Sequence, residues 1–211
     1  LTRLSRLNMK LKFLKVFLVS FALIFAALNG RFLYANVNYW LGGGIAPASD
    51  QPPAIQTLPA TDKAPLPDEA TLVIEKLGVS APVVFGVASD NDTIIKNLEN
   101  GVVHYSNTSK PGMEGVSIIL GHSSAYPWYK GKYGSVFALL GKLQPGDKFS
   151  VRYDNGRVFN FVVKQSVVFS PFADDSRLTQ IEKAPGSSLV LISCWPVGTN
   201  YKRIAVQAEL I

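Results

Sequence analysis

The sequence has only one cysteine, Cys194, and this scarcity limits what the folded chain can be. A single thiol cannot form an intrachain disulfide, so a domain of this size has to rely on its hydrophobic core. The chain also has only two histidines, and neither stands in a cluster with acidic residues or the cysteine. We therefore expect no metal site. The lone thiol has two interpretations, a small buried core residue or a reactive nucleophile.

Acidic residues are missing from the first 41 positions, which hold six basic ones. The rest of the chain carries 15 basic and 15 acidic residues, so the net charge of +6 belongs to the N-terminal segment. A folded part with balanced charge has no electrostatic basis for binding a polyanion. We therefore expect no nucleic-acid partner.

Residues 1–41 combine this basic flank with an uncharged apolar run of thirteen residues, Val16 to Leu28. The run is shorter than the roughly 20 residues that span a bilayer core. It can be lengthened because Lys12 and Lys15 can extend their charges to the interface, and aromatic residues follow Arg31. We expect a single-pass transmembrane helix with a cytoplasmic N-terminus and an extracellular remainder. A cleaved signal peptide is the alternative, although no small-x-small cleavage site follows the run.

Residues 42–68 are rich in proline, glycine and alanine and show no hydrophobic periodicity. This composition is typical of a flexible or partly extended tether. From residue 69 the pattern changes to short apolar runs that are separated by turn residues.

The segment 69–211 is therefore predicted to be one mainly β domain. It contains about eight short strand patterns with little helix between them, which favours a closed or nearly closed barrel, largely connected by hairpins. Short helices are expected at 90–98, capped by Asp90 or Asp92, and at 135–140, with a weak helical piece at 176–183. The expected strands are Leu72–Ile74, Ala81–Phe85, Gly101–Tyr105, Val116–Leu120, Lys148–Tyr153, Val158–Phe169, Ser187–Cys194 and Tyr201–Leu210.

Three side chains in this domain have the chemistry of a thiol-dependent acyl transfer. Cys194 ends an apolar run that predicts a buried strand, and Arg203 lies nine residues further on, in the next strand. His122 follows Gly121 at the end of another such run. A thiol attacks an amide as the thiolate and needs electropositive neighbours. A histidine can transfer the proton, and an arginine can stabilise the oxyanion of the tetrahedral intermediate.

This arrangement resembles the sortase family of cysteine transpeptidases over roughly residues 70–211. The resemblance implies an eight-stranded sortase-like barrel without a cofactor. It implies that Cys194 is the nucleophile, His122 the general acid/base and Arg203 the group that positions substrate and stabilises the oxyanion. Ser193, Trp195 and His104 are candidate substrate-binding residues. Many family members have Thr-Leu-x-Thr-Cys where this chain has Val190-Leu-Ile-Ser-Cys194, so the subfamily stays open.

The reaction that the resemblance implies has two steps. The thiolate opens the Thr–Gly bond of an LPxTG-like C-terminal sorting signal on an exported protein and forms a thioacyl-enzyme. An amine from a peptidoglycan precursor or from a pilin lysine then resolves it. Specificity is expected in the connection 170–186. The alternatives are another Cys/His transpeptidase of the cell wall, such as an L,D-transpeptidase, and a non-catalytic membrane-tethered surface β-domain.

One stretch of the tether is similar to the signal itself. Leu58-Pro-Ala-Thr-Asp62 matches four of the five positions of Leu-Pro-x-Thr-Gly. Self-recognition of this stretch is one hypothesis. The alternative is coincidence, because proline-rich segments produce Leu-Pro pairs by chance.

Overall fold

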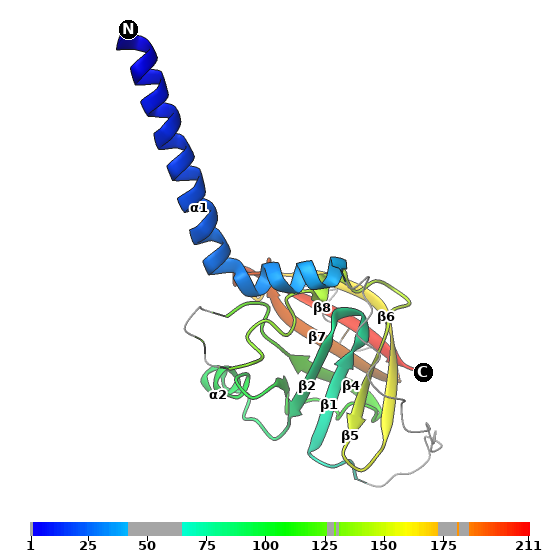
Figure 1. The fold of residues 1–211 in the computed structure, drawn as a ribbon. Coiled ribbons are helices and arrows are strands. Elements are labelled where there is room, and N and C mark those ends of the chain that lie inside the picture. The colour runs from blue at the N-terminus through cyan, green and yellow to red at the C-terminus, as the bar shows by residue number, and fades with distance from the viewer. Residues whose placement is uncertain (1, 42–64, 126–128, 130, 173–180, 182–185) are drawn as a thin grey trace.

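The structure is a computed structural model that describes residues 2–41, 65–125, 129, 131–172, 181 and 186–211 (Figure 1). Its described part is a long helix followed by a closed barrel of eight strands in the order β1-β2-β3-β4-β7-β8-β6-β5. The mainly β, eight-stranded barrel predicted from the sequence is confirmed. The strands are β1 Glu69–Ile74, β2 Val79–Val84, β3 Val102–His104, β4 Gly115–Leu120, β5 Lys148–Tyr153, β6 Val158–Phe169, β7 Ser187–Trp195 and β8 Lys202–Leu210.

The barrel is not a simple series of hairpins, and two of its strand pairings are parallel. Four sequential pairs are antiparallel, namely β1 with β2, β3 with β4, β5 with β6 and β7 with β8. However, β2 pairs with β3 in parallel, and β4 pairs with β7 in parallel. The second parallel pairing matters for function, because it brings the C-terminal ends of β4 and β7 to the same end of the barrel.

The core explains why β7 and β8 each contain a continuous apolar run, Leu189–Ile192 and Ile204–Val206. Leu189 and Leu191 point into the barrel, where they pack with side chains such as Phe161. Val190, which alternates with them, packs outside the barrel against Ala205 and Ile181. A strand that is covered on both faces needs a continuous apolar run. Each large side chain that is fully buried in this way stabilises the fold by roughly 1.5–3 kcal/mol.

The predicted first helix is present as α2, Asn91–Asn97. Asp90 is its N-cap, and its carboxylate accepts a hydrogen bond from Thr93 N at 2.9 Å. The structure also describes two 3₁₀ helices, η1, Glu75–Leu77, and η2, Leu140–Lys142.

The helix predicted at 135–140 is wrong. These residues form successive four-residue turns, with Ala138 N bonded to Ser135 O at 3.0 Å. The N–H of Phe137 donates to His122 O at 2.9 Å, so it is not available to a helical ladder. The helical piece predicted at 176–183 lies outside the described residues apart from Ile181, as does most of the connection 170–186.

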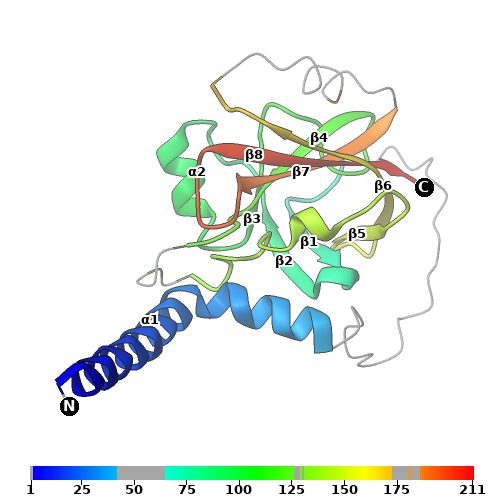
Figure 2. The ribbon, with the colours of Figure 1, turned by 90° about the horizontal axis from the view of Figure 1, so that it is seen from above.

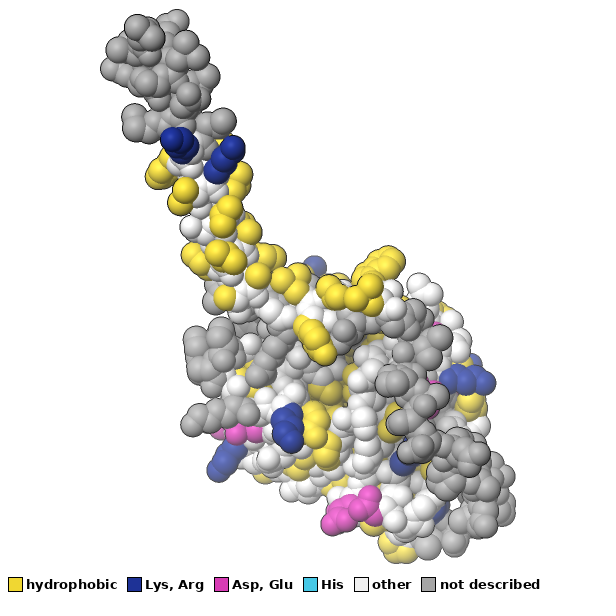
Figure 3. All heavy atoms as spheres, in the orientation of Figure 1, with side chains coloured by type: hydrophobic (Ala, Val, Ile, Leu, Met, Phe, Trp, Pro, Cys, Tyr) yellow, Lys and Arg dark blue, Asp and Glu magenta, His cyan; other side chains and the backbone are white. Residues whose placement is uncertain are grey.

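The N-terminal helix α1, Thr2–Leu41, projects away from the barrel and then turns so that its last part lies along it (Figures 1 and 2). In this last part Leu33, Asn36 and Tyr39 recur at a spacing of three and are half-buried, whereas Tyr34 and Trp40 are exposed. The outer part exposes many hydrophobic side chains (Figure 3). Within the described residues, no helix has a stretch of the length and hydrophobicity that crossing a membrane requires.

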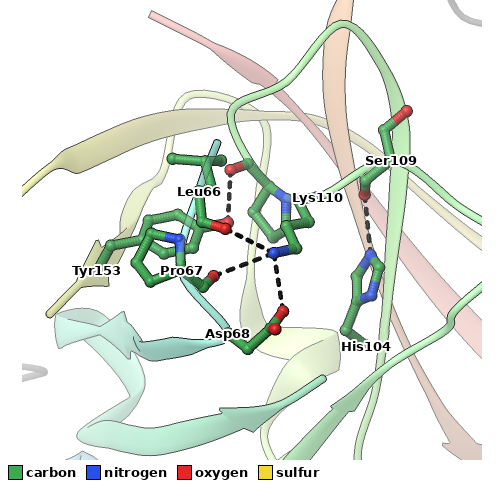
Figure 4. Close-up of polar contacts among 8 residues, drawn as sticks. Leu66, Pro67, Asp68, His104, Ser109, Lys110 and Tyr153 are labelled. Atoms are coloured by element: carbon green, nitrogen blue, oxygen red, sulfur yellow. Dashed lines mark hydrogen bonds and ion pairs between the residues drawn. The ribbon is translucent and has the colours of Figure 1, made fainter. Parts of the chain in front are cut away.

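The chain enters the barrel through a fixed attachment around Lys110 (Figure 4). The Lys110 ammonium donates to Leu66 O at 2.6 Å and to Pro67 O at 3.2 Å, and lies 2.8 Å from the Asp68 carboxylate. Leu66 is 5% exposed, so the barrel already holds residues that the sequence assigned to the tether. Because β1, β4 and β7 run in the same direction, this attachment lies at the end of the barrel opposite to Cys194.

Candidate active site

Cys194 and Arg203 face each other across the ladder between β7 and β8. The antiparallel register pairs Cys194 with Arg203 and Trp195 with Lys202, next to the turn that joins the two strands. Both side chains of the first pair are half-buried. The spacing of nine residues is therefore the spacing of a direct cross-strand pair, in which side chains lie close together.

His122 reaches the same end of the barrel through the parallel pairing of β4 with β7. That register ends at Leu120 with Ile192, and it continues through a bond from Gly121 N to Ile192 O at 3.1 Å. The Ser193 hydroxyl then donates to Gly121 O at 2.7 Å. His122 and Cys194 are the next residue on each side. The structure thus brings together Cys194, His122 and Arg203 from three strand ends.

Ser193 does not have the substrate-binding position predicted for it. Its side chain is buried, and its hydroxyl is used by the Gly121 carbonyl, so it joins the two strands that carry Cys194 and His122. This bond gives the hydroxyl before the cysteine a structural role. An apolar residue would leave the buried carbonyl oxygen without its side-chain donor.

The backbone of His122 is held tightly by Phe137. The His122 carbonyl accepts the Phe137 N–H, and the Phe137 ring lies against Gly121 so closely that a Cβ at position 121 would overlap it. Glycine is therefore required before the histidine because of space. The contacts of Gly121 and His122 with Phe137 therefore fix the position of the His122 backbone.

The His122 imidazole is half-buried and contacts the edge of the Tyr129 ring at a centroid distance of 5.5 Å. Burial lowers the pKa of His122 from its ordinary value, and the Glu99 carboxylate partly opposes that shift. A lowered pKa keeps the imidazole neutral at pH 7, the state in which it can accept a proton. The sequence placed Tyr129 in an aromatic loop and contained no signal that linked it to the histidine.

Arg203 keeps an unneutralised charge beside the thiol. Its Nη1 donates to Asn200 O and to Lys202 O, each at 3.0 Å, and these bonds fix the guanidinium on the turn. In the part of the chain that the structure describes, no carboxylate forms an ion pair with it. A fixed, unpaired guanidinium is suited to stabilise negative charge that develops next to it during a reaction.

Trp195 lies directly beside the cysteine and forms a fixed wall. Its indole packs on Gly141, where a Cβ would come within 2.9 Å of the ring, and near Ile204. The Trp195–Pro196 peptide bond is cis. Of the three candidate substrate-binding residues, Trp195 adjoins Cys194 and, unlike Ser193 and His104, is only half-buried.

His104 lies opposite Ile119 of β4, but its side chain is buried, so the structure gives no support to its predicted substrate-binding role. It is 4% exposed, its Nε2 donates to Ser109 O at 2.9 Å, and its ring packs on Phe85. The loop that it holds leads into the N-terminal end of β4, close to Lys110 (Figure 4). Its buried position is that of a structural histidine. Among the described residues, no group of three His, Cys, Asp or Glu side chains could hold a metal ion.

Comparison with known proteins agrees with this geometry. The family model of the sortase domain matches residues 72–211. The chain belongs to the sortase family. Sortases are cysteine transpeptidases, and the residues that carry the resemblance all lie in the matched region.

Individual relatives are distant. Sortase D of Bacillus subtilis (strain 168) is 26% identical over 143 residues, which cover 66% of this chain and 62% of that protein. This sortase therefore spans less than two thirds of the length of the Bacillus relative. The solved structure of a Clostridium perfringens sortase D5 transpeptidase is 27% identical with a TM-score of 0.51, covering 68% of this chain and 79% of that one. Sortase C-1 of Actinomyces oris is 26% identical with a TM-score of 0.54, covering 85% and 98%.

Proposed function

We propose that this sortase cleaves an LPxTG-like sorting signal of exported proteins and transfers the cleaved protein to an amine. The observation that supports it most is the register that sets Cys194 opposite Arg203, while the Ser193–Gly121 bond brings His122 to the same end. A structural cysteine would not need a histidine and an unpaired arginine beside it.

The proposed reaction uses each of the three groups in both steps. The sulfur of Cys194 attacks the threonine carbonyl carbon, and the neutral His122 takes the thiol proton. Arg203 stabilises the oxyanion of the tetrahedral intermediate. His122 gives the proton to the leaving glycine nitrogen, the C–N bond breaks, and a thioacyl-enzyme remains. An incoming amine attacks that thioester, loses a proton to His122, and releases the thiol as a new amide forms.

The amine in this proposal comes from a peptidoglycan precursor or from a pilin lysine. These two acceptors have the same chemistry, a primary amine, and differ in what surrounds it. Transfer assays with each acceptor in turn, under otherwise identical conditions, separate wall attachment from polymerisation.

We also propose that α1 anchors the enzyme in the cell membrane, with the catalytic domain outside. Support comes from the basic flank and from the exposed side chains of Phe17, Phe21 and Phe25, which need an apolar environment. Full-length protein is expected in the membrane fraction after alkaline washing, and a variant that lacks residues 1–41 in the soluble fraction. Recovery of both forms in the soluble fraction would contradict the anchor.

The function is tested by offering the full-length enzyme, in detergent, a library of Leu-Pro-x-Thr-x peptides and detecting the thioacyl adduct by mass spectrometry. We expect an adduct whose mass ends at the threonine. Cys194→Ala is the control and should form none, because the chain has no other thiol. If no peptide forms an adduct and the thiol does not react with iodoacetamide at any pH, the barrel is a non-catalytic domain.

A further inference from the structure

Tyr129 contacts the proposed general acid/base from the side of the loop that follows β4. Its ring and the His122 imidazole meet edge to face, with an interplanar angle of 83°. In this orientation the positive edge of one ring lies on the negative face of the other, which is a favoured geometry for aromatic pairs. The contact limits rotation of the imidazole while leaving its nitrogens free of any bond to the tyrosine.

The hydroxyl of Tyr129 fixes the ring to another element. It donates to Leu98 O at 2.9 Å, across 31 residues of sequence. Leu98 is the C-terminal cap of α2, and its side chain is buried with Val87 and Val103. A carbonyl at the end of a helix lacks an intrahelical partner, so the tyrosine satisfies it. The ring is thereby attached to the barrel wall as well as to its own loop.

Two glycines leave room for this ring. A Cβ on Gly131 would lie 2.5 Å from the Tyr129 hydroxyl, and a Cβ on Gly134 would lie 2.7 Å from Cδ1. Neither glycine has a positive φ, so conformational freedom is not what requires glycine at these positions. The backbone of the loop encloses the tyrosine where any other residue would collide with it.

We propose that Tyr129 is a positioning residue that orients the His122 imidazole for proton transfer. The inference rests on the proposed function. The reaction needs one imidazole orientation that serves the sulfur and the leaving nitrogen in turn, and a ring held on one face meets that need better than a freely rotating one. Among the described residues, the Glu99 carboxylate after α2 is a charged group that acts on the imidazole, and Tyr129 is a titratable group in contact with it.

The first test compares the kinetics of two substitutions in the full-length enzyme. Tyr129→Phe keeps the ring and loses the bond to Leu98, whereas Tyr129→Leu also loses the aromatic contact. We expect Tyr129→Leu to lower kcat for peptide transfer by about tenfold or more, within the range that acid/base groups contribute, with KM changed less than about twofold. Tyr129→Phe should keep at least about a third of kcat, because the net contribution of one neutral hydrogen bond is small.

Tyr133→Leu is the matched control, because Tyr133 is a half-buried tyrosine of the same loop that packs on the core. It should leave kcat within about twofold of the unchanged enzyme, as expected of a side chain that does not contact the acid/base group. An unchanged kcat in Tyr129→Leu, or an equal loss in Tyr133→Leu, would overturn the proposal.

The second test needs no substrate and separates this inference from the proposed function. The chain has only two histidines, so the imidazole signals of His122 and His104 can be followed by NMR across pH. In Tyr129→Leu the His122 carbon-bound protons should shift as the ring current is lost. The His122 pKa should rise, since burial is the main cause that lowers it. His104 should not change. An unchanged His122 signal would show that the tyrosine does not hold the imidazole, whether or not the enzyme transfers peptides.

Discussion

Arg203 can stabilise an oxyanion through the planar shape of its guanidinium as well as through its charge. Its Nη1 is fixed by two carbonyls of its own turn, and in the described residues no carboxylate pairs with the guanidinium. Arg203→Lys keeps the positive charge but loses the planar guanidinium, which can donate two parallel hydrogen bonds. We expect kcat/KM for the peptide to fall by at least about a hundredfold, the size of effect seen when an oxyanion donor is removed. Lys202→Ala, which removes an exposed cation from the neighbouring position, is the control and should retain most activity. A mild effect of Arg203→Lys would mean that charge alone is sufficient.

The two histidines make the stability of the folded state depend on pH. Burial lowers the pKa of both His104 and His122 from the ordinary value of 6.5. The unfolded chain therefore takes up protons first as the pH falls, and the free energy of unfolding decreases from about pH 6.5 downward. Asp90 has a lowered pKa as well, but its ordinary value is 3.8, so it contributes only at more acid pH.

His104→Gln tests this assignment, because glutamine can still donate to Ser109 O and does not titrate near neutral pH. We expect the loss of unfolding free energy between pH 7.5 and pH 5 to be smaller in His104→Gln than in the unchanged protein. Urea unfolding at both values gives the comparison. An equal loss in the two proteins would contradict a role for His104.

At the scale of strands, a side-chain bond between β7 and β4 extends their backbone ladder toward the active site. Ser193→Ala removes the hydroxyl that donates to Gly121 O and leaves that buried oxygen without it, at a cost of about 1–3 kcal/mol. Ser117→Ala is a matched control, because the Ser117 hydroxyl is also buried and has no hydrogen-bond partner among the described residues. Its removal should be neutral or stabilising. Unfolding in urea measures both, and peptide transfer should decline only in Ser193→Ala.

Sequence patterns predicted those elements whose cause is local. Alternating and continuous apolar runs indicated the strands, and the pair Asp90 and Asp92 indicated the start of α2, because each signal depends on neighbours a few residues away. The parallel pairing of β4 with β7 had no local signal. The helix expected at 135–140 was wrong for the same reason, since Phe137 gives its N–H to the remote His122 carbonyl.

The same distinction between local and remote causes applies to the residues of the candidate site. The spacing of Cys194 and Arg203 is a property of one hairpin and could be predicted. The burial of Ser193 and His104, and the contact of Tyr129 with His122, depend on which segments meet in three dimensions. Such contacts are visible only once the barrel is closed.

For the whole molecule, the attachment at Lys110 limits what the tether can reach. Leu58–Asp62 lies outside the described residues, but the chain between Thr61 and Leu66 spans at most about 18 Å. The strand β7 extends about 23 Å from Ser187 to Cys194, which is longer than this reach, and Cys194 lies at the end of the barrel opposite to the attachment. If the stretch is recognised at all, we therefore expect binding between molecules rather than within one.

Diluting the full-length enzyme tests whether such binding occurs between molecules. If Leu58–Asp62 is recognised, the specific activity of the full-length enzyme should rise as the protein is diluted, and Thr61→Ala should remove the dependence. Binding within one molecule would be independent of concentration. A specific activity that does not change with dilution in either protein would mean that the similarity of Leu58–Asp62 to Leu-Pro-x-Thr-Gly is a coincidence.

The parallel pairing of β4 with β7 also determines when during folding the enzyme can become active. Ser193 and Gly121 are 72 residues apart, and their contact closes a loop whose entropy must be lost before any bond across it forms. The hairpin of Cys194 and Arg203 can form early from nearby residues, but without β4 it has no histidine. Peptide transfer on refolding should therefore return only with the slowest structural phase. A chain halted before that step carries a thiol and an arginine in register, yet lacks the group that would move a proton between them.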